Sequence, residues 1–177
     1  MDLYSNGEKL LTDNDVPTNY WNLIDNSATF LNFNSINASY ERQLTTPNGN
    51  KALTKDTAWN FPSFKLNIIE GQIYTFSMMA RFASNSNYSS MRLYPPTGGE
   101  YEPLKDKAFS VHYLTPNIWH KGYVVFKALK NATVDMTIAN SQDVRTDFGD
   151  YMVNKGTYPL DWNYSLNDLK SMMSANK

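Results

Sequence analysis

The stretch Ile73-Tyr-Thr-Phe-Ser-Met-Met-Ala-Arg-Phe82 decides the fold class, because apolar residues occupy every second position along it. The positions between them carry mostly polar residues, including Thr75, Ser77 and Arg81. A period of two places the apolar side chains on one side of an extended chain. The stretch therefore predicts a strand from a sheet with one buried face and one mostly polar face.

The same period continues beyond this strand. The turn sequence Ser84-Asn-Ser-Asn87 leads into a second alternating segment, 88–94, so the two segments predict a β-hairpin. Turn sequences such as Pro47-Asn-Gly-Asn50 separate the other alternating segments. About nine short strands with turns between them are typical of an antiparallel sandwich or barrel. The other strands are predicted over 28–33, 38–44, 64–69, 108–114, 119–127, 133–139 and 148–153.

The end of the chain predicts a single helix. Ser165 and Asp168 have the spacing of a capping box. A helix of about ten residues is marginal alone, so its apolar side should pack either on its own sandwich or on a neighbouring subunit or domain. We divide the chain into a lead-in over 1–8, a β domain over 9–164 and a helix over 165–177. The apolar residues at helical spacing are Leu166, Leu169, Met172 and Met173.

The composition limits the classes of partner. The 177 residues suffice for one domain with a sizeable core, and the absence of Cys excludes disulfides and thiolate metal sites. The 16 basic and 17 acidic residues leave a net charge of −1, which predicts no nucleic-acid partner. No apolar run reaches the ~20 residues of a membrane helix, and the first residues do not resemble a signal peptide. We therefore expect no membrane insertion.

The sequence contains no motif of a zinc hydrolase, a serine hydrolase or a phosphate-binding enzyme. The two histidines, His112 and His120, lack the spacing of a zinc-hydrolase motif. There is also no Gly-x-Ser-x-Gly elbow and no phosphate-binding glycine loop. Carboxylates such as Glu41 and Asp135 could form a glycosidase pair, but 17 acidic residues always offer such pairs. We expect a protein that is not an enzyme and requires no cofactor.

Several motifs occur in a characteristic order along residues 9–168. They are Glu70-Gly71 before a strand, the turn-Trp-strand segment 115–126, the strand 131–138, and Lys155-Gly156 followed by Asp161-Trp162. Their order and spacing resemble the jelly-roll carbohydrate-binding-like domains in tail and baseplate proteins of bacteriophages that infect Gram-positive bacteria. The resemblance implies an all-β, antiparallel two-sheet jelly roll with a short C-terminal helix.

The resemblance also implies a function. The function it implies is that of a noncatalytic domain that recognises host cell-wall polysaccharide during adsorption. The domain would belong to the tail or baseplate of a virion that is assembled in the host cytoplasm. The expected partners are bacterial cell-surface saccharide and other phage tail or baseplate proteins. Two alternatives stay open: an accessory domain of the virion tail without sugar binding, and a carbohydrate-binding module of a secreted glycoside hydrolase.

A saccharide site needs an aromatic platform beside side chains that form hydrogen bonds with hydroxyl groups. Strand parity places Arg81, Arg92 and Tyr94 on one outward surface of the predicted hairpin, although each arginine could equally be a solvated sheet residue. His112 joins this surface if its neighbours Phe109 and Val111 are core residues. The predicted carbohydrate-binding residues are Trp59, Arg81, Tyr88, Arg92, Tyr94, Tyr101 and His112.

Jelly-roll carbohydrate modules often hold a structural calcium ion. The resemblance therefore implies Asp147 and Asp150, in the last predicted strand, as ligands of a structural Ca²⁺, although the chain has no dense array of Asp residues. Trp119 and Trp162 match positions that look structural in the family. We therefore expect both tryptophans in the core.

Overall fold

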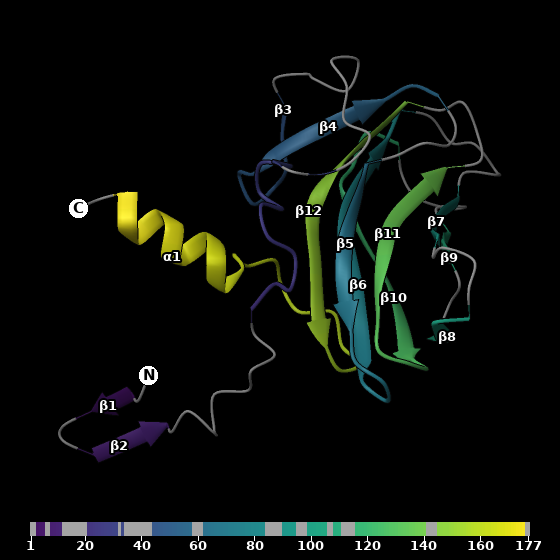
Figure 1. Cartoon of the computed structure of the whole chain (residues 1–177). Coiled ribbons are helices and arrows are strands. Elements are labelled where there is room, and N and C mark those ends of the chain that lie inside the picture. Colours follow the sequence, from purple (N-terminus) through teal and green to yellow (C-terminus); the bar gives the residue numbers. More distant parts are fainter. Residues whose placement is uncertain are drawn as a thin grey trace.

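Figure 1 shows the computed structural model of the chain. It describes residues 3–5, 8–11, 21–31, 33, 44–57, 62–83, 90–94, 99–105, 108–110, 116–140 and 145–175. In this part of the chain, no helix is long and apolar enough to cross a membrane.

Two antiparallel sheets pack face to face and form a β-sandwich (Figure 1). The six-stranded sheet has the order β3-β4-β12-β6-β10-β8, and the four-stranded sheet has the order β5-β11-β7-β9. The strands of the first sheet are β3 (Leu44–Thr45), β4 (Lys51–Lys55), β12 (Thr146–Lys155), β6 (Ile73–Phe82), β10 (His120–Ala128) and β8 (Tyr101–Lys105). Those of the second are β5 (Ser63–Ile68), β11 (Ala132–Asn140), β7 (Ser90–Tyr94) and β9 (Ala108–Ser110).

The strand order is that of a jelly roll. From β4 to β12 each strand lies in the other sheet from the strand before it. As a result β12, the last strand, lies between β4 and β6 in one sheet, and β11 lies between β5 and β7 in the other. This interleaving of early and late strands is the double Greek key that defines the jelly roll. The predicted fold class is therefore confirmed.

The apolar side of β6 lies in the core, as its alternation predicts. Tyr74, Phe76 and Phe82 are all at most 4% exposed and belong to one hydrophobic cluster between the sheets. Tyr151 of β12 belongs to the same cluster, and its ring contacts those of Phe76, Phe64 and three further residues, Phe30, Phe33 and Phe148. Burial of such rings contributes the largest share of the stability of a sandwich.

Two predictions about strands are wrong. The predicted hairpin does not form, because β6 pairs with β10 and β12, whereas β7 belongs to the other sheet and pairs with β11 and β9. The segment 28–33 is not a strand, because Asn26 and Phe30 have positive φ angles and the Phe30 N–H donates to the Asn26 carbonyl. This turn buries Phe30 and Phe33 in the core without strand pairing. Of the predicted strand 38–44, only Leu44 lies within the described residues.

The helix α1 (Leu166–Ala175) begins at the predicted capping box. The Asp168 N–H donates to Ser165 Oγ over 3.0 Å, and the Ser165 N–H donates back to the Asp168 carboxylate over 3.4 Å. The same carboxylate accepts the Asn26 N–H, which fixes the start of the helix to the sandwich. None of the helix side chains is buried, and Figure 1 shows α1 pointing away from the sheets.

Two short strands at the beginning of the chain, β1 (Leu3–Ser5) and β2 (Glu8–Leu11), form a separate two-stranded antiparallel sheet. Figure 1 shows this hairpin beside the sandwich rather than within it. The sequence predicts a lead-in over 1–8, and the hairpin occupies much of that segment.

Candidate functional site

The outer face of the six-stranded sheet carries the best candidate site. Along β6, Thr75, Ser77, Met79 and Arg81 point away from the core, because the alternating residues belong to the core cluster. Thr75 and Ser77 are nevertheless buried. The Thr75 hydroxyl donates to the Gly156 carbonyl over 2.7 Å, which indicates that the chain after β12 turns back across this end of the outer face. Met79 and Arg81 remain partly exposed beyond the covered end.

Arg81 belongs to a polar row that crosses three strands. Its Nε and Nη2 atoms donate to Asp147 Oδ2 over 2.9 and 2.7 Å, and the Thr54 hydroxyl donates to the other oxygen over 2.6 Å. Sheet register brings these residues together, because Asp147 is paired with Arg81 on one side and with Thr54 on the other. The Arg81 guanidinium lies 5.1 Å from the centre of the Trp119 ring, a cation–π contact.

Asp150 organises the turn beside this row. Both carboxylate oxygens accept hydrogen bonds from the turn 46–50: Oδ1 from Thr46 at 2.8 Å and Asn50 at 2.6 Å, and Oδ2 from Asn48 at 2.8 Å. Asp150 is 2% exposed and has a φ of 54° within a β-bulge of β12. Next to it, Gly149 has no side chain, which leaves room for the Thr46 methyl group. The bulge therefore receives the turn and holds it against the sheet.

A hollow of about 260 Å³ lies between this turn and the chain that follows β12. We define the sheet-face site by the five residues Asn48, Met79, Lys121, Asp161 and Trp162, all of which line this hollow. The Lys121 ammonium donates to Asp161 Oδ1 over 3.1 Å and to the Leu160 carbonyl over 2.7 Å. The site thus combines an aromatic ring with a carboxylate, an ammonium and an amide.

Trp162 is anchored and still partly exposed. Its indole N–H donates to the Ser27 hydroxyl over 3.1 Å, and its ring meets that of Tyr164 edge to face at 4.8 Å. Because two contacts fix the ring before any ligand arrives, little side-chain entropy would be lost on binding. A fixed, partly exposed ring next to charged and amide groups can hold a flat molecule that has an apolar face and a polar rim.

The structure brings only part of the predicted constellation together. Arg81 lies beside the sheet-face site, but Arg92 and Tyr94 are in β7 of the other sheet and cannot share its face. The prediction of one common surface is therefore wrong, because alternation gives the face of a strand but not the sheet to which it belongs. Trp59, Tyr88 and His112 lie outside the described residues.

Tyr101 does not form an exposed platform. Its ring packs against Phe126 at 5.0 Å, and its hydroxyl is buried without a hydrogen-bond partner among the described residues. Burial, together with the negative charge of Glu100, raises the pKa of the Tyr101 phenol above its usual value. Tyr101 is therefore part of the packing at the end of the sandwich.

The prediction that two tryptophans lie in the core is also wrong. Trp119 and Trp162 are both only partly buried, and both lie on the outer face of the six-stranded sheet. Each follows a turn and precedes or follows a strand, a position from which a side chain can reach the sheet surface as easily as the core. In the sequence, Asp161 next to Trp162 is the signal of a polar surrounding.

Asp147 and Asp150 do not have the surroundings of calcium ligands. Every one of their carboxylate oxygens accepts a hydrogen bond from a protein group, including the Arg81 guanidinium, and a cation would have to displace these donors. Among the described residues, no three His, Cys, Asp or Glu side chains gather in a group that could hold a metal ion. The calcium ion stays a prediction that this arrangement does not support.

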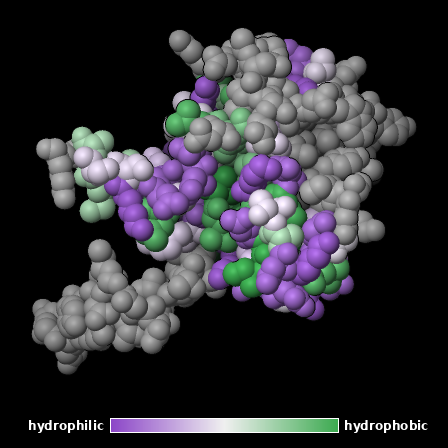
Figure 2. Space-filling view, viewed as in Figure 1, coloured by the Kyte–Doolittle hydropathy of each residue, from purple (hydrophilic) through white to green (hydrophobic). Residues whose placement is uncertain are grey.

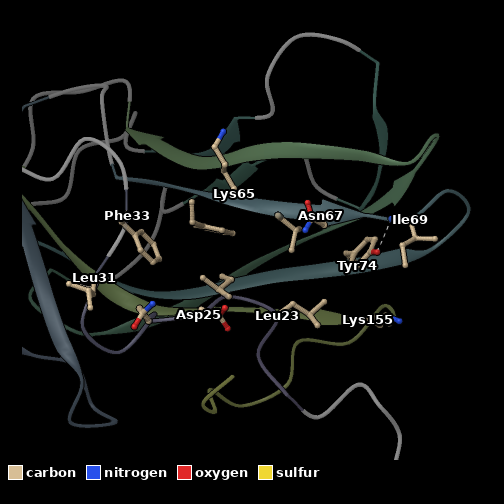
Figure 3. Close-up of a pocket in the computed structure, with 13 residues that line it drawn as sticks. Leu23, Asp25, Leu31, Phe33, Lys65, Asn67, Ile69, Tyr74 and Lys155 are labelled. Carbon is tan, nitrogen blue, oxygen red and sulfur yellow. Dashed lines mark hydrogen bonds between the residues drawn. The ribbon is translucent and has the colours of Figure 1, made fainter. Parts of the chain in front are cut away.

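A second and larger hollow, of about 710 Å³, lies at the open side of the sandwich. We call it the edge groove. Figure 3 shows it between β5, with Lys65 and Asn67, and the segment 23–26, with Leu23 and Asp25. Leu31, Phe33 and Ile69 add apolar surface, and no exposed aromatic ring lines the groove. Because its described lining lacks a platform, the groove fits a saccharide less well than the sheet-face site does.

Comparison with known proteins gives little for this chain. No family model matches the sequence, and no curated protein does. Among solved structures, the chain is similar to the crystal structure of a "putative sugar binding protein" from Bacteroides thetaiotaomicron, with a TM-score of 0.41 and 14% sequence identity. The similarity covers 79% of this chain and 96% of that chain. A likeness this distant carries no functional conclusion, so function has to come from the residues of the site.

Proposed function

We propose that this chain is a noncatalytic carbohydrate-binding domain and that the sheet-face site holds the saccharide. The observation that carries the proposal is the fixed, partly exposed Trp162 ring beside the Lys121–Asp161 pair. A sugar ring has an apolar C–H face that packs on indole and an equatorial rim of hydroxyl groups. Ammonium, carboxylate and amide groups together donate to and accept from such hydroxyls.

The charge balance of the site favours a neutral saccharide over an anionic one. Lys121 is paired with Asp161, and Arg81 is paired with Asp147, so each cation already has its counter-ion. A phosphate or uronate would have to displace a carboxylate from one of these pairs. A neutral hydroxyl can instead add to a pair without breaking it, since both partners keep free hydrogen-bonding directions.

The absence of catalysis is part of the same proposal. A hydrolase of glycosides needs one carboxylic acid and one carboxylate that are free to exchange protons or attack the sugar. Asp147 and Asp150, the buried carboxylates of this face, are engaged by protein donors on both oxygens. Asp161 is exposed and paired with Lys121. This arrangement is suited to holding a sugar rather than cleaving it.

The biological setting of the proposal is a phage tail or baseplate whose host is a Gram-positive bacterium. It is supported by the resemblance of the ordered sequence motifs to domains of that kind. The saccharide would then be a polysaccharide of the host cell wall, and the neighbours of the domain would be other virion proteins.

The test compares binding of fluorescently labelled protein to whole Gram-positive cells and to purified wall polysaccharide. Trp162→Ala should weaken binding by about two- to tenfold, since one ring contact is worth about 0.5–1.5 kcal/mol beyond its buried area. Lys121→Ala should weaken binding as well, because the site loses a donor to sugar hydroxyls. Lys65→Ala is the matched control, because Lys65 also pairs with an aspartate at 3.2 Å but lies on the other sheet. Absence of binding by the parent would favour an accessory structural domain instead.

A further inference from the structure

The edge groove follows the unpaired side of β5. Strand β5 is the terminal strand of its sheet and pairs only with β11 among the described strands. The groove is lined by Phe64 and Leu66, which face the core, and also by Lys65 and Asn67, which face outward. Successive side chains of a strand point to opposite faces of its sheet. Both sets can line one groove only where that groove follows the unpaired edge of the strand.

The backbone N–H and C=O groups along this edge of β5 can form hydrogen bonds with a further strand. In an antiparallel pair every second residue directs its N–H and C=O groups away from the partner, so β5 presents a row of such groups to the groove. Proteins usually protect such an edge with proline or with unpaired charge. Residues 63–68 contain no proline, and the outward Lys65 is neutralised by Asp135 on the neighbouring strand at 3.2 Å.

The walls of the groove favour an extended polypeptide with apolar side chains. Leu31 is 62% exposed and Ile69 is 57% exposed, and both line the groove. Figure 2, viewed as Figure 1, shows hydrophobic residues at the surface between two hydrophilic areas in the middle of this view. An added strand would bond to β5 through its backbone and would place alternate side chains on this apolar surface.

The opposite wall is already fixed in place. The Leu23 N–H donates to the Val153 carbonyl over 2.9 Å, which attaches segment 23–26 to β12. The Asn26 N–H donates to the Asp168 carboxylate at the start of α1. An added strand would therefore not have to order this wall, and a preformed site loses less entropy on binding.

The chain carries a suitable strand of its own. The hairpin β1–β2 forms a separate sheet beside the sandwich, and its register pairs Leu3 with Leu11 and Ser5 with Glu8. A two-stranded hairpin without a further partner is at best marginally stable in water. Its sequence contains the apolar residues Leu3, Tyr4, Leu10 and Leu11. Among the described strands, the hairpin has no further neighbour, and β5 has none on its groove side.

We propose that residues 3–11 of a second copy of this chain add to the free edge of β5 and extend its sheet, so that the chain forms a closed homo-oligomer. Two copies satisfy each other reciprocally, since each provides one hairpin and one edge. This interaction does not depend on saccharide binding, because the sheet-face site lies on the outer face of the other sheet.

The test measures the molar mass of the full chain in solution by light scattering after size exclusion. The proposal expects a whole-number multiple of the single-chain mass for the parent and the single-chain mass after deletion of residues 1–11. Leu31→Asp combined with Ile69→Asp should also give single chains, because two charges would enter the apolar wall. The matched control is Ile118→Asp, which changes a similarly exposed isoleucine, 51%, outside the groove and should leave the oligomer intact.

Circular dichroism verifies that each variant keeps its β-sheet signal, and hydrogen exchange gives a second readout. Backbone amides of β5 on the groove side should exchange slowly in the parent and at least tenfold faster in the deletion variant, which has lost the added strand. A parent of single-chain mass would overturn the proposal. An unchanged oligomer after the deletion, or after the double substitution in the groove, would overturn it as well.

Discussion

The substitution Asp150→Ala tests how the sheet-face site is built. The Asp150 carboxylate is the common acceptor for three side chains of the turn 46–50, namely Thr46, Asn48 and Asn50. Removing it leaves the Thr46 and Asn50 donors buried without this acceptor, because these residues are only 4% and 7% exposed. Asn48 lies at an exposed position of the turn, where water can replace the lost partner.

The expected cost follows from these three bonds. Each buried donor that loses its partner costs about 1–3 kcal/mol, and loss of the buried charge returns part of this sum because its desolvation penalty disappears. We expect a loss of about 2–4 kcal/mol in the free energy of unfolding. For a domain of this size that lowers Tm by about 5–15 °C. Asp150→Gly should be about 1 kcal/mol more stable than the alanine variant, because glycine tolerates the φ of 54° better.

The assay is urea denaturation followed by tryptophan fluorescence. Asp135→Ala is the control, since Asp135 belongs to an exposed ion pair with Lys65 that should contribute about 0–1 kcal/mol. If Asp150→Ala unfolds within 0.5 kcal/mol of the parent, a difference typical of surface substitutions, Asp150 does not hold the turn. The description of the site as preformed would then be refuted.

Three further predictions concern the same sandwich. Gly149→Ala should destabilise the fold by about 1–3 kcal/mol, because the new Cβ would lie 2.5 Å from the Thr46 methyl group; thermal unfolding followed by circular dichroism measures this loss. Arg81→Ala should cost about 1.5–3 kcal/mol in urea denaturation, since the buried Asp147 loses its guanidinium; a cost no larger than that of Lys65→Ala would contradict this role. Tyr101→Phe should be neutral or stabilising near pH 7, because it removes a buried hydroxyl without a described partner. The pKa of the Tyr101 phenol is higher in the folded than in the unfolded chain. The protonated phenol therefore makes its full contribution to the free energy of unfolding below the unfolded pKa of about 10, and this contribution falls at higher pH. The parent should lose stability in alkali more steeply than the phenylalanine variant.

The sequence was sufficient for the fold class because its signals are local. The alternation along Ile73–Phe82 shows which side chains enter the core, and the capping box at Ser165 marks the start of the helix. The partner strands could not be predicted in the same way. Strand β6 has the same alternation whether its neighbour is β7 or β12, because pairing depends on contacts between distant segments.

The candidate site was only partly predictable for the same reason. Arg81 was identified because strand parity alone places it on the outer face. Asn48 and Asp150 were visible only as a turn residue and a weak metal ligand, since their 2.8 Å contact joins positions 102 residues apart. Trp162 was assigned to the core because it matches a position that looks structural in the family, whereas its indole N–H donates to Ser27, 135 residues away in the chain.

The most direct test of saccharide binding at the sheet face is a titration of isotope-labelled protein with purified wall polysaccharide, followed by amide and indole NMR shifts. The account predicts that the largest changes fall on Asn48, Lys121, Asp161 and the indole N–H of Trp162. Amides of β5 and of segment 23–26, which line the edge groove, should move little. Changes concentrated in the edge groove, or no changes at saturating polysaccharide, would contradict the assignment of this face as the saccharide site.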